Sequence, residues 1–265
     1  MCGRYTIAHN VEEILDRFEA ILSAASGIDS DSSTDQDDNP PLPARANYNV
    51  APTVAVPIIL RPKLEDGGLG ARTLLAAKWG LLPSWIKDIK KTKPFINARA
   101  ETLLESRMFK SPYKKHRCII PADSFYEWQR TEDSKVPMRI LMKDRGLFGF
   151  AGIWEEWRGP ENEKIRSCSI ITVAANKLVQ PVHDRMPAIL PREYESLWLD
   201  TTKFDPEELA KILAPYPEEL MELYPVSNLV NSVKNNSPEL IVPRDASAGD
   251  AQEQACQTQL QIPFN

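Results

Sequence analysis

A series of short β segments separated by turns most constrains how this chain can fold. Residues 117–130 (RCIIPADSFYEWQR) predict a strand, a turn and a second strand. The segments 136–142, 148–157 and 167–175 are rich in β-branched and aromatic residues and continue the series. Together these segments predict a mostly antiparallel, barrel-like twisted sheet as the core of the domain.

Further strand and loop signals lie on both sides of this series. Residues 54–60 form an apolar run that predicts a strand, and 63–70 read as a hairpin loop. Residues 73–85 predict a strand that runs into a loop and contain two tryptophans. Residues 181–190 predict a proline-bounded loop that enters another strand.

Helical periodicity is limited to short segments. Residues 10–22 place apolar side chains at helical spacing, and Asn10 is a favoured N-cap residue. Other short helices are expected to begin near Ala98 and to occupy 192–199 and 205–213. We therefore predict a single α+β domain in which short helices flank the sheet core.

Two acidic, polar segments stand apart from the rest of the chain. Residues 23–43, rich in Ser, Asp and Pro, predict a disordered insertion, and residues 245–265 predict a disordered tail. The folded domain is therefore expected to span residues 1–244. The formal net charge of −5 arises from these two segments, and the remainder is mildly basic. This charge permits nucleic-acid binding but is weak evidence for it.

The cysteines and the hydropathy pattern indicate an intracellular location. Cys2, Cys118, Cys168 and Cys256 lack the spacing of a disulfide framework or a metal site. No apolar run is long enough to span a membrane, and the N-terminus has no signal pattern. We therefore expect no metal, no membrane association and a reducing compartment.

Cys2 follows the initiator methionine, which is normally trimmed before so small a side chain. Trimming would leave an α-amine with a pKa of about 7.7–8.0, against about 10.4 for lysine, so more of this amine is neutral and nucleophilic at pH 7. A neutral amine converts an aldehyde into an imine, and the adjacent thiol can then close a thiazolidine ring. The simpler alternative is an N-terminal residue without a chemical role.

Three further residues are candidates for acid–base or positioning roles, and each also has an ordinary structural explanation. His183 lies between two prolines in a loop, where functional groups concentrate. Glu127 lies among aromatic residues, where burial raises a carboxyl pKa, but a solvent-facing Glu at a sheet edge is commoner. Asn97 could cap the helix expected after it, and Arg99 and Arg107 could be helix-surface charges.

Six motifs connect these residues into one pattern. They are MCGRY (1–5), YNVAPT (48–53), KWGLLPSW (78–85), NARAET (97–102), FYEW (125–128) and PVHDRMP (181–187). In this order they resemble the SOS response-associated peptidase family, whose members are abasic-site-processing proteins. The resemblance extends from Cys2 to about residue 230 and is interrupted mainly at 23–43 and 63–70.

The resemblance implies a sensor of abasic sites in single-stranded DNA during the DNA damage response. Cys2, freed by removal of Met1, would form a covalent thiazolidine crosslink that shields the lesion. Asn97 would hold Cys2 and the sugar. Glu127 would transfer protons and support the self-cleavage that frees the N-terminus. His183 would shuttle protons at the sugar and in imine formation or reversal. AP-lyase activity would compete with ring closure, and no cofactor is required.

The resemblance also implies a DNA-binding surface. Its positions are Arg4, Arg99, Arg107 and Arg185 at phosphates, Pro52 and Trp79 at bases, and Asn47. Arginine contacts to phosphate would position the strand without reading sequence, and tryptophan stacking contributes roughly 1–3 kcal/mol per base. We expect a monomer, a nuclear location in a eukaryote or the cytoplasm and nucleoid of a bacterium, and the replication machinery as a protein partner.

Two alternative functions stay open on the sequence alone. A thiol peptidase or amidohydrolase would use Cys2 to attack an amide, assisted by His183 and Glu127. A non-catalytic single-stranded-DNA binding module would show salt-sensitive binding that depends neither on Cys2 nor on abasic sites.

Overall fold

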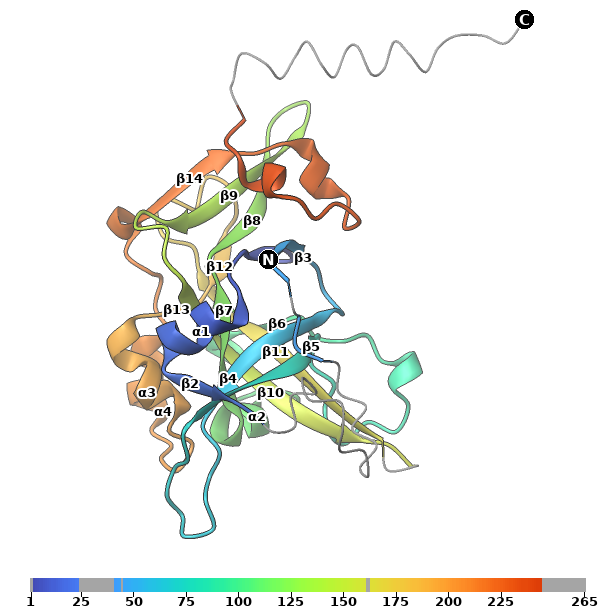
Figure 1. Cartoon of the computed structure of the whole chain (residues 1–265), viewed down its shortest axis with the longest axis vertical. Helices are drawn as coiled ribbons and strands as arrows, with labels where there is room; N and C mark the ends of the chain where they lie inside the picture. The colour runs from blue at the N-terminus through green and yellow to red at the C-terminus, as the bar shows by residue number, and fades with distance from the viewer. Residues whose placement is uncertain (1, 24–40, 44, 161–162, 245–265) are drawn as a thin grey trace, which may run out of the picture.

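Two β-sheets organise the computed structural model, which describes residues 2–23, 41–43, 45–160 and 163–244 (Figure 1). The five-stranded sheet has the order β14–β9–β8–β1–β3, and all neighbours in it are antiparallel. Its strands are β1 (Tyr5–Ile7), β3 (Asn47–Val50), β8 (Ser124–Arg130), β9 (Lys135–Met142) and β14 (Met221–Pro225).

The second sheet closes on itself because β11 pairs with β10 on one side and with β5 on the other. The closed ring runs β5–β4–β7–β10–β11, and only the β11–β5 contact is parallel. These strands are β4 (Ala55–Leu60), β5 (Arg72–Trp79), β7 (Arg117–Ala122), β10 (Phe148–Arg158) and β11 (Lys164–Ala174). The ring confirms the predicted mostly antiparallel, barrel-like core.

Four short strands extend this ring, and short helices lie beside it (Figure 1). The strands are β2 (Ala20–Leu22) on β5, β6 (Asn97–Arg99) on β11, β12 (Arg185–Pro187) on β11 and β13 (Ile189–Leu190) on β10. The helices are α1 (Val11–Phe18), α2 (Lys110–Lys115), α3 (Glu195–Leu199) and α4 (Pro206–Ile212). Single turns of 3₁₀ helix are η2 (Ile89–Lys91), η3 (Ala100–Thr102), η4 (Arg192–Tyr194), η5 (Glu218–Leu220), η6 (Asn228–Asn231) and η7 (Pro238–Ile241). This arrangement confirms the predicted α+β class.

The first helix is shorter than its periodicity predicts. It begins after Asn10, which forms a reciprocal capping box with Glu13. It ends at Phe18, because Glu19 adopts a left-handed conformation with φ of 52°. The following residues 20–22 then pair with β5 as strand β2. The predicted last turn of this helix was therefore wrong, because pairing with β5 satisfies the backbone there instead.

The helix expected to begin near Ala98 is also corrected by the structure. Residues 97–99 form strand β6, which pairs in parallel with Ile170–Thr172 of β11. A single 3₁₀ turn follows only from Ala100. Asn97 is thus a strand residue and not a helix cap, because its backbone belongs to the β11 ladder.

Most of the predicted insertion at 23–43 and the whole predicted tail at 245–265 lie outside the described residues. Their disorder, and the domain limits of 1–244, therefore stay predictions. In the described part of the chain, no helix is long and apolar enough to cross a membrane.

Candidate active site

Cys2 lies at the N-terminal approach to β1 and is fully buried. Its Sγ donates a long hydrogen bond of 3.6 Å to the carbonyl oxygen of Arg4. Burial, followed by the negative charge of nearby Glu127, raises the pKa of the Cys2 thiol well above its usual range. The thiol is therefore protonated at neutral pH in this arrangement. A base must remove its proton before the sulfur can act as a nucleophile.

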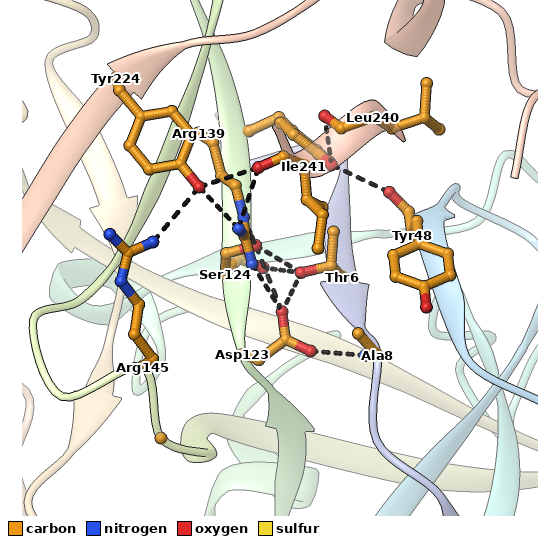
Figure 2. Close-up of polar contacts among 12 residues, drawn as sticks. Thr6, Ala8, Tyr48, Asp123, Ser124, Arg139, Arg145, Tyr224, Leu240 and Ile241 are labelled. Carbon is orange, nitrogen blue, oxygen red and sulfur yellow. Dashed lines mark hydrogen bonds and ion pairs between the residues drawn. The ribbon is translucent and has the colours of Figure 1, made fainter. Parts of the chain in front are cut away.

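A buried polar network fixes β1, the strand that follows Cys2. The Asp123 carboxylate accepts a hydrogen bond from Thr6 Oγ1 and pairs with Arg139 at 3.4 Å (Figure 2). Arg139 also donates to Ser124 Oγ at 2.8 Å and to the Tyr224 hydroxyl at 2.7 Å. These side chains come from β1, β8, β9, β14 and the turn before β8, so the network sets the position of β1 within its sheet.

Asn97 connects the second sheet to the N-terminus. Its Nδ2 donates a hydrogen bond of 2.8 Å to the carbonyl oxygen of Cys2. Its Oδ1 is buried and has no hydrogen-bond partner among the described residues. An amide held at one end and unsatisfied at the other can accept a hydrogen bond from a bound hydroxyl or amine.

Glu127 approaches Cys2 from β8. The pairing of Tyr5 with Phe125, and the hydrogen bond of 2.9 Å from Tyr126 N to Arg4 O, bring β8 alongside the N-terminal residues. Burial raises the pKa of the Glu127 carboxyl, and the positive charge of His183 opposes this shift. His183 therefore lies close enough to Glu127 to affect the charge of this carboxyl, an arrangement that suits proton transfer.

His183 is held in a turn, partly exposed, with one ring nitrogen facing two partners. The backbone N–H of Arg185 donates to His183 Nδ1 at 3.0 Å, which requires an unprotonated Nδ1. Asp184 Oδ1 lies 2.8 Å from the same atom and forms an ion pair when Nδ1 carries a proton. The ring thus has a partner for Nδ1 in both protonation states.

Arg99, Arg107 and Arg185 are placed differently. Arg99 is exposed on β6, two residues from Asn97. Arg185 is held by a two-point ion pair with Glu101, at 2.7 and 2.9 Å, and it also donates to the backbone of β11. Arg107 is exposed further along the chain. Arg99 is therefore the freer of the two arginines near Asn97.

Arg4 has a structural role that the sequence did not reveal. Its Nη1 donates to Asn49 Oδ1 at 2.6 Å and to Val230 O at 2.9 Å. The Asn49 amide in turn donates to Ser232 O at 3.0 Å and to Asn235 O at 2.9 Å. Asn49 is therefore a hub that connects β3, the N-terminus and residues 228–235. Its position in the YNVAPT motif was the sequence signal that could have indicated this role.

Asn47 and Pro52 flank this hub. Asn47 Oδ1 accepts a hydrogen bond of 2.9 Å from Asn49 N, so Asn47 helps to orient the hub residue. Pro52 is partly exposed just after β3. A surface position suits the predicted base contact of Pro52, whereas the Asn47 side chain already has a contact within the protein.

The two tryptophans of the KWGLLPSW motif have opposite environments. Trp79 is fully buried, packs edge-on against Tyr5 with ring centroids 5.3 Å apart, and donates from Nε1 to Ile96 O at 2.9 Å. It presents no ring face to solvent, so the base contact predicted for Trp79 has no surface in this structure. Trp85 is 51 % exposed and stacks under the Arg107 guanidinium at 4.6 Å. Trp85 is thus the exposed aromatic residue of this motif, although the sequence pointed to Trp79 as the base contact.

The structure thus brings Cys2, Asn97, Glu127 and His183 together from separate parts of the chain. Within the described ranges, no group of three or more His, Cys, Asp and Glu side chains is arranged to hold a metal ion. The site combines a thiol, a carboxyl with a raised pKa, an imidazole and an amide with a free acceptor. These groups can donate and accept protons while a nucleophile adds to a carbonyl carbon.

Comparisons with known proteins identify relatives of this chain. A model of the family described as "SOS response associated peptidase (SRAP)" matches residues 1–233. Abasic site processing protein YoqW of Bacillus subtilis is 43 % identical over 91 % of this chain and 99 % of its own length. Abasic site processing protein HMCES of Rattus norvegicus is 32 % identical over 92 % of this chain and 76 % of its own length.

A solved structure supports the fold. The crystal structure of a protein from Bacteroides thetaiotaomicron has a TM-score of 0.75 and 27 % sequence identity to this chain. The match covers 92 % of this chain and 100 % of that protein.

Proposed function

Since the chain belongs to the SOS response associated peptidase (SRAP) family, we propose that it captures abasic sites in single-stranded DNA as a covalent crosslink through Cys2. The observation that carries the proposal is the meeting of Cys2 with Asn97, Glu127 and His183 at one site. The relatives YoqW and HMCES are named abasic site processing proteins, which points to the same substrate.

The chemistry begins once removal of Met1 frees the α-amine of Cys2. The amine adds to the aldehyde carbon of the ring-opened abasic sugar, and loss of one water gives an imine. The Cys2 sulfur then adds to the imine carbon, and its proton passes to the nitrogen, which closes a thiazolidine. Intramolecular attack has a very high effective concentration, so ring closure outruns β-elimination of the 3′ phosphate, the lyase reaction that the imine also permits.

Glu127 and His183 supply the proton transfers that these steps need. The raised pKa of Glu127 keeps part of this carboxyl protonated nearer neutral pH, so it can donate to the departing hydroxyl. His183 has a partner for Nδ1 whether or not it is protonated, which suits a residue that accepts and returns a proton. Asn97 orients the Cys2 backbone and offers its free Oδ1 to the sugar.

DNA would approach over the exposed groups near this site. Arg99 and Arg107 offer charge to phosphates, and the half-exposed ring of Trp85 offers a stacking surface that takes any base. Arg185 can add a phosphate contact while Glu101 orients it. Such contacts hold the strand without reading its sequence, as a lesion sensor requires.

The finer parts of the proposal follow from this substrate. The protein acts where single-stranded DNA is exposed, so we place it inside the cell, in the nucleus of a eukaryote, with the replication machinery as a partner. The proposed protein acts as a monomer. The same nucleophile and acid–base pair would release the N-terminal residue by self-cleavage.

The test is the intact mass of the purified protein before and after mixing with an abasic single-stranded oligonucleotide. We expect a mass without Met1, followed by a stable gain of one oligonucleotide minus one water. Cys2→Ser should lose the stable product, because an oxazolidine is far less stable than a thiazolidine. Cys118→Ala, which removes another buried thiol, should keep it. A trimmed protein that gains no mass would overturn the proposal and favour the thiol peptidase.

A further inference from the structure

The residues around Cys2 can be located by the positions along strand β11 with which they pair. At its C-terminal end, Thr172 pairs with Arg99, and Ala174 pairs with Arg185. Two residues earlier than Thr172, Ile170 pairs with Asn97, the residue that holds Cys2. The arginines therefore lie at and beyond the level of Asn97, towards the C-terminal end of β11.

The loop Trp85–Lys93 lies near the opposite, N-terminal end of β11. Ile165 of β11 pairs with Trp157, and Trp157 Nε1 donates to the carbonyl oxygen of Ile86 at 2.7 Å. With a rise of about 3.3 Å per residue, the level of Ile165 is roughly 16 Å along β11 from that of Ile170. Asn97, and with it Cys2, thus lies between the two arginines and this loop.

The loop Trp85–Lys93 concentrates positive charge. It contains four lysines and a single Asp. The side chains of Lys87, Lys91 and Lys93 are exposed. Lys91 Nζ lies 3.5 Å from the Asp88 carboxylate, but both side chains are in solvent, so this pair neutralises little. The loop therefore presents net positive charge next to the exposed ring of Trp85.

Hydrogen bonds at its base and across it hold the backbone of this loop in place. Leu81 and Phe95 exchange backbone hydrogen bonds of 2.9 and 3.1 Å and close the base of the loop. Thr92 Oγ1 donates to Asp88 O at 2.9 Å across it. Lys93 is four residues from Asn97, so their backbones are at most about 14 Å apart. These hydrogen bonds distinguish the loop from a solvated segment of charged residues, which would not need to be held beside the site.

We propose that the loop Trp85–Lys93 is a second phosphate-binding surface, which grips the DNA strand on the side of the lesion away from Arg99 and Arg185. The inference rests on the proposed function. Lysine ammonium groups bind phosphates as point charges and read no sequence. The abasic nucleotide is then held between two charged surfaces, one on each flank, which keeps the sugar over Cys2 while the slow covalent steps proceed.

The test compares Lys87→Gln/Lys91→Gln/Lys93→Gln with a control of equal charge change, Lys63→Gln/Lys135→Gln/Lys177→Gln, whose lysines are exposed elsewhere. Two oligonucleotides carry the abasic site near one end, with a long flank only on the 5′ side or only on the 3′ side. Affinity is measured against salt in the Cys2→Ser background, which forms no stable crosslink. Thermal melting checks that both variants fold.

We expect the loop variant to lose affinity several-fold for one of the two oligonucleotides and to keep it for the other. For the affected one, the slope of log K against log salt should fall by about 2, since each single-strand phosphate contact contributes about 0.7. The control should bind both like the parent protein. Equal losses on both flanks, or none on either, would overturn the inference. Crosslinking by the wild type is a separate readout and reports only on the proposed function.

Discussion

The side-chain amide of Asn97 donates a hydrogen bond of 2.8 Å to the backbone carbonyl of Cys2. The bond joins β6, which pairs with the closed ring of strands, to the N-terminal approach of the other sheet. Cys2, the candidate nucleophile, is therefore held by a residue whose own position is fixed by β11. A chain terminus, which would otherwise fray, becomes part of an ordered site.

Replacing Asn97 should slow crosslinking more than it lowers stability. Asn97→Ala removes one hydrogen bond, worth about 0.5–1.5 kcal/mol of stability, but it also frees the Cys2 backbone and removes the acceptor offered to the sugar. We expect a rate of crosslink formation at least about tenfold lower, equivalent to 1.4 kcal/mol or more. Gel-resolved time courses under saturating DNA measure this rate. An unchanged rate with an unchanged melting temperature would show that the contact is incidental.

Glu127→Gln should raise stability at neutral pH. Burial raises the pKa of this carboxyl above its ordinary value of 4.5, so the folded state binds the proton more tightly than the unfolded state. That contribution is fully present below pH 4.5 and is lost as the pH rises through the folded pKa. The amide never ionises, so the Tm of Glu127→Gln minus that of the wild type should grow with pH.

The melting series is recorded by calorimetry from below pH 4.5 to neutrality. Each kcal/mol corresponds to a shift of about 2–4 °C in a protein of this size. The same variant should crosslink more slowly, because the amide cannot transfer a proton. Gln129→Glu, a new carboxyl on the same strand, should show no such growth in Tm with pH. A Tm difference for Glu127→Gln that is independent of pH would contradict the prediction.

The pair between Asp123 and Arg139 should contribute strongly to stability. Arg139→Met leaves the buried Asp123 carboxylate without its cation, which costs about 3–5 kcal/mol. The double variant Asp123→Asn/Arg139→Met removes both charges and should recover part of this loss. Denaturant unfolding of the two single variants and the double variant gives the coupling energy. Simple additivity would mean that the two side chains act independently.

The two tryptophans of the KWGLLPSW motif should separate stability from DNA binding. Trp79→Ala creates a cavity in the core and should cost about 3–5 kcal/mol, a fall in Tm of roughly 10 °C. Trp85→Ala should leave Tm nearly unchanged and weaken single-stranded DNA binding by about 1–3 kcal/mol. Trp85→Phe, which keeps a ring face, should retain most of the affinity. A Trp85→Ala variant that binds like the wild type would exclude the stacking role.

The sequence by itself determined the β-rich α+β class and singled out Cys2 as the candidate nucleophile. Alternating apolar residues and turn signals are local properties, so the strands from 117 to 175 were visible without a structure. Cys2 was identifiable for the same reason, because the reactivity of an N-terminal aminothiol is intrinsic to one residue. The motifs also identified Asn97, Glu127 and His183 as candidates, although none had a decisive signal alone.

Only the tertiary structure decided which of these residues meet and what they face. Asn97 is a strand residue because its partner β11 lies some seventy positions later in the chain. Trp79 and Trp85 share one motif, yet Tyr5 of β1 covers the first and leaves the second open. The ring closes through β11 and β5, a contact between distant segments that no local pattern encodes. Burial and pairing of this kind depend on the whole chain, because each surface is covered by residues remote in sequence.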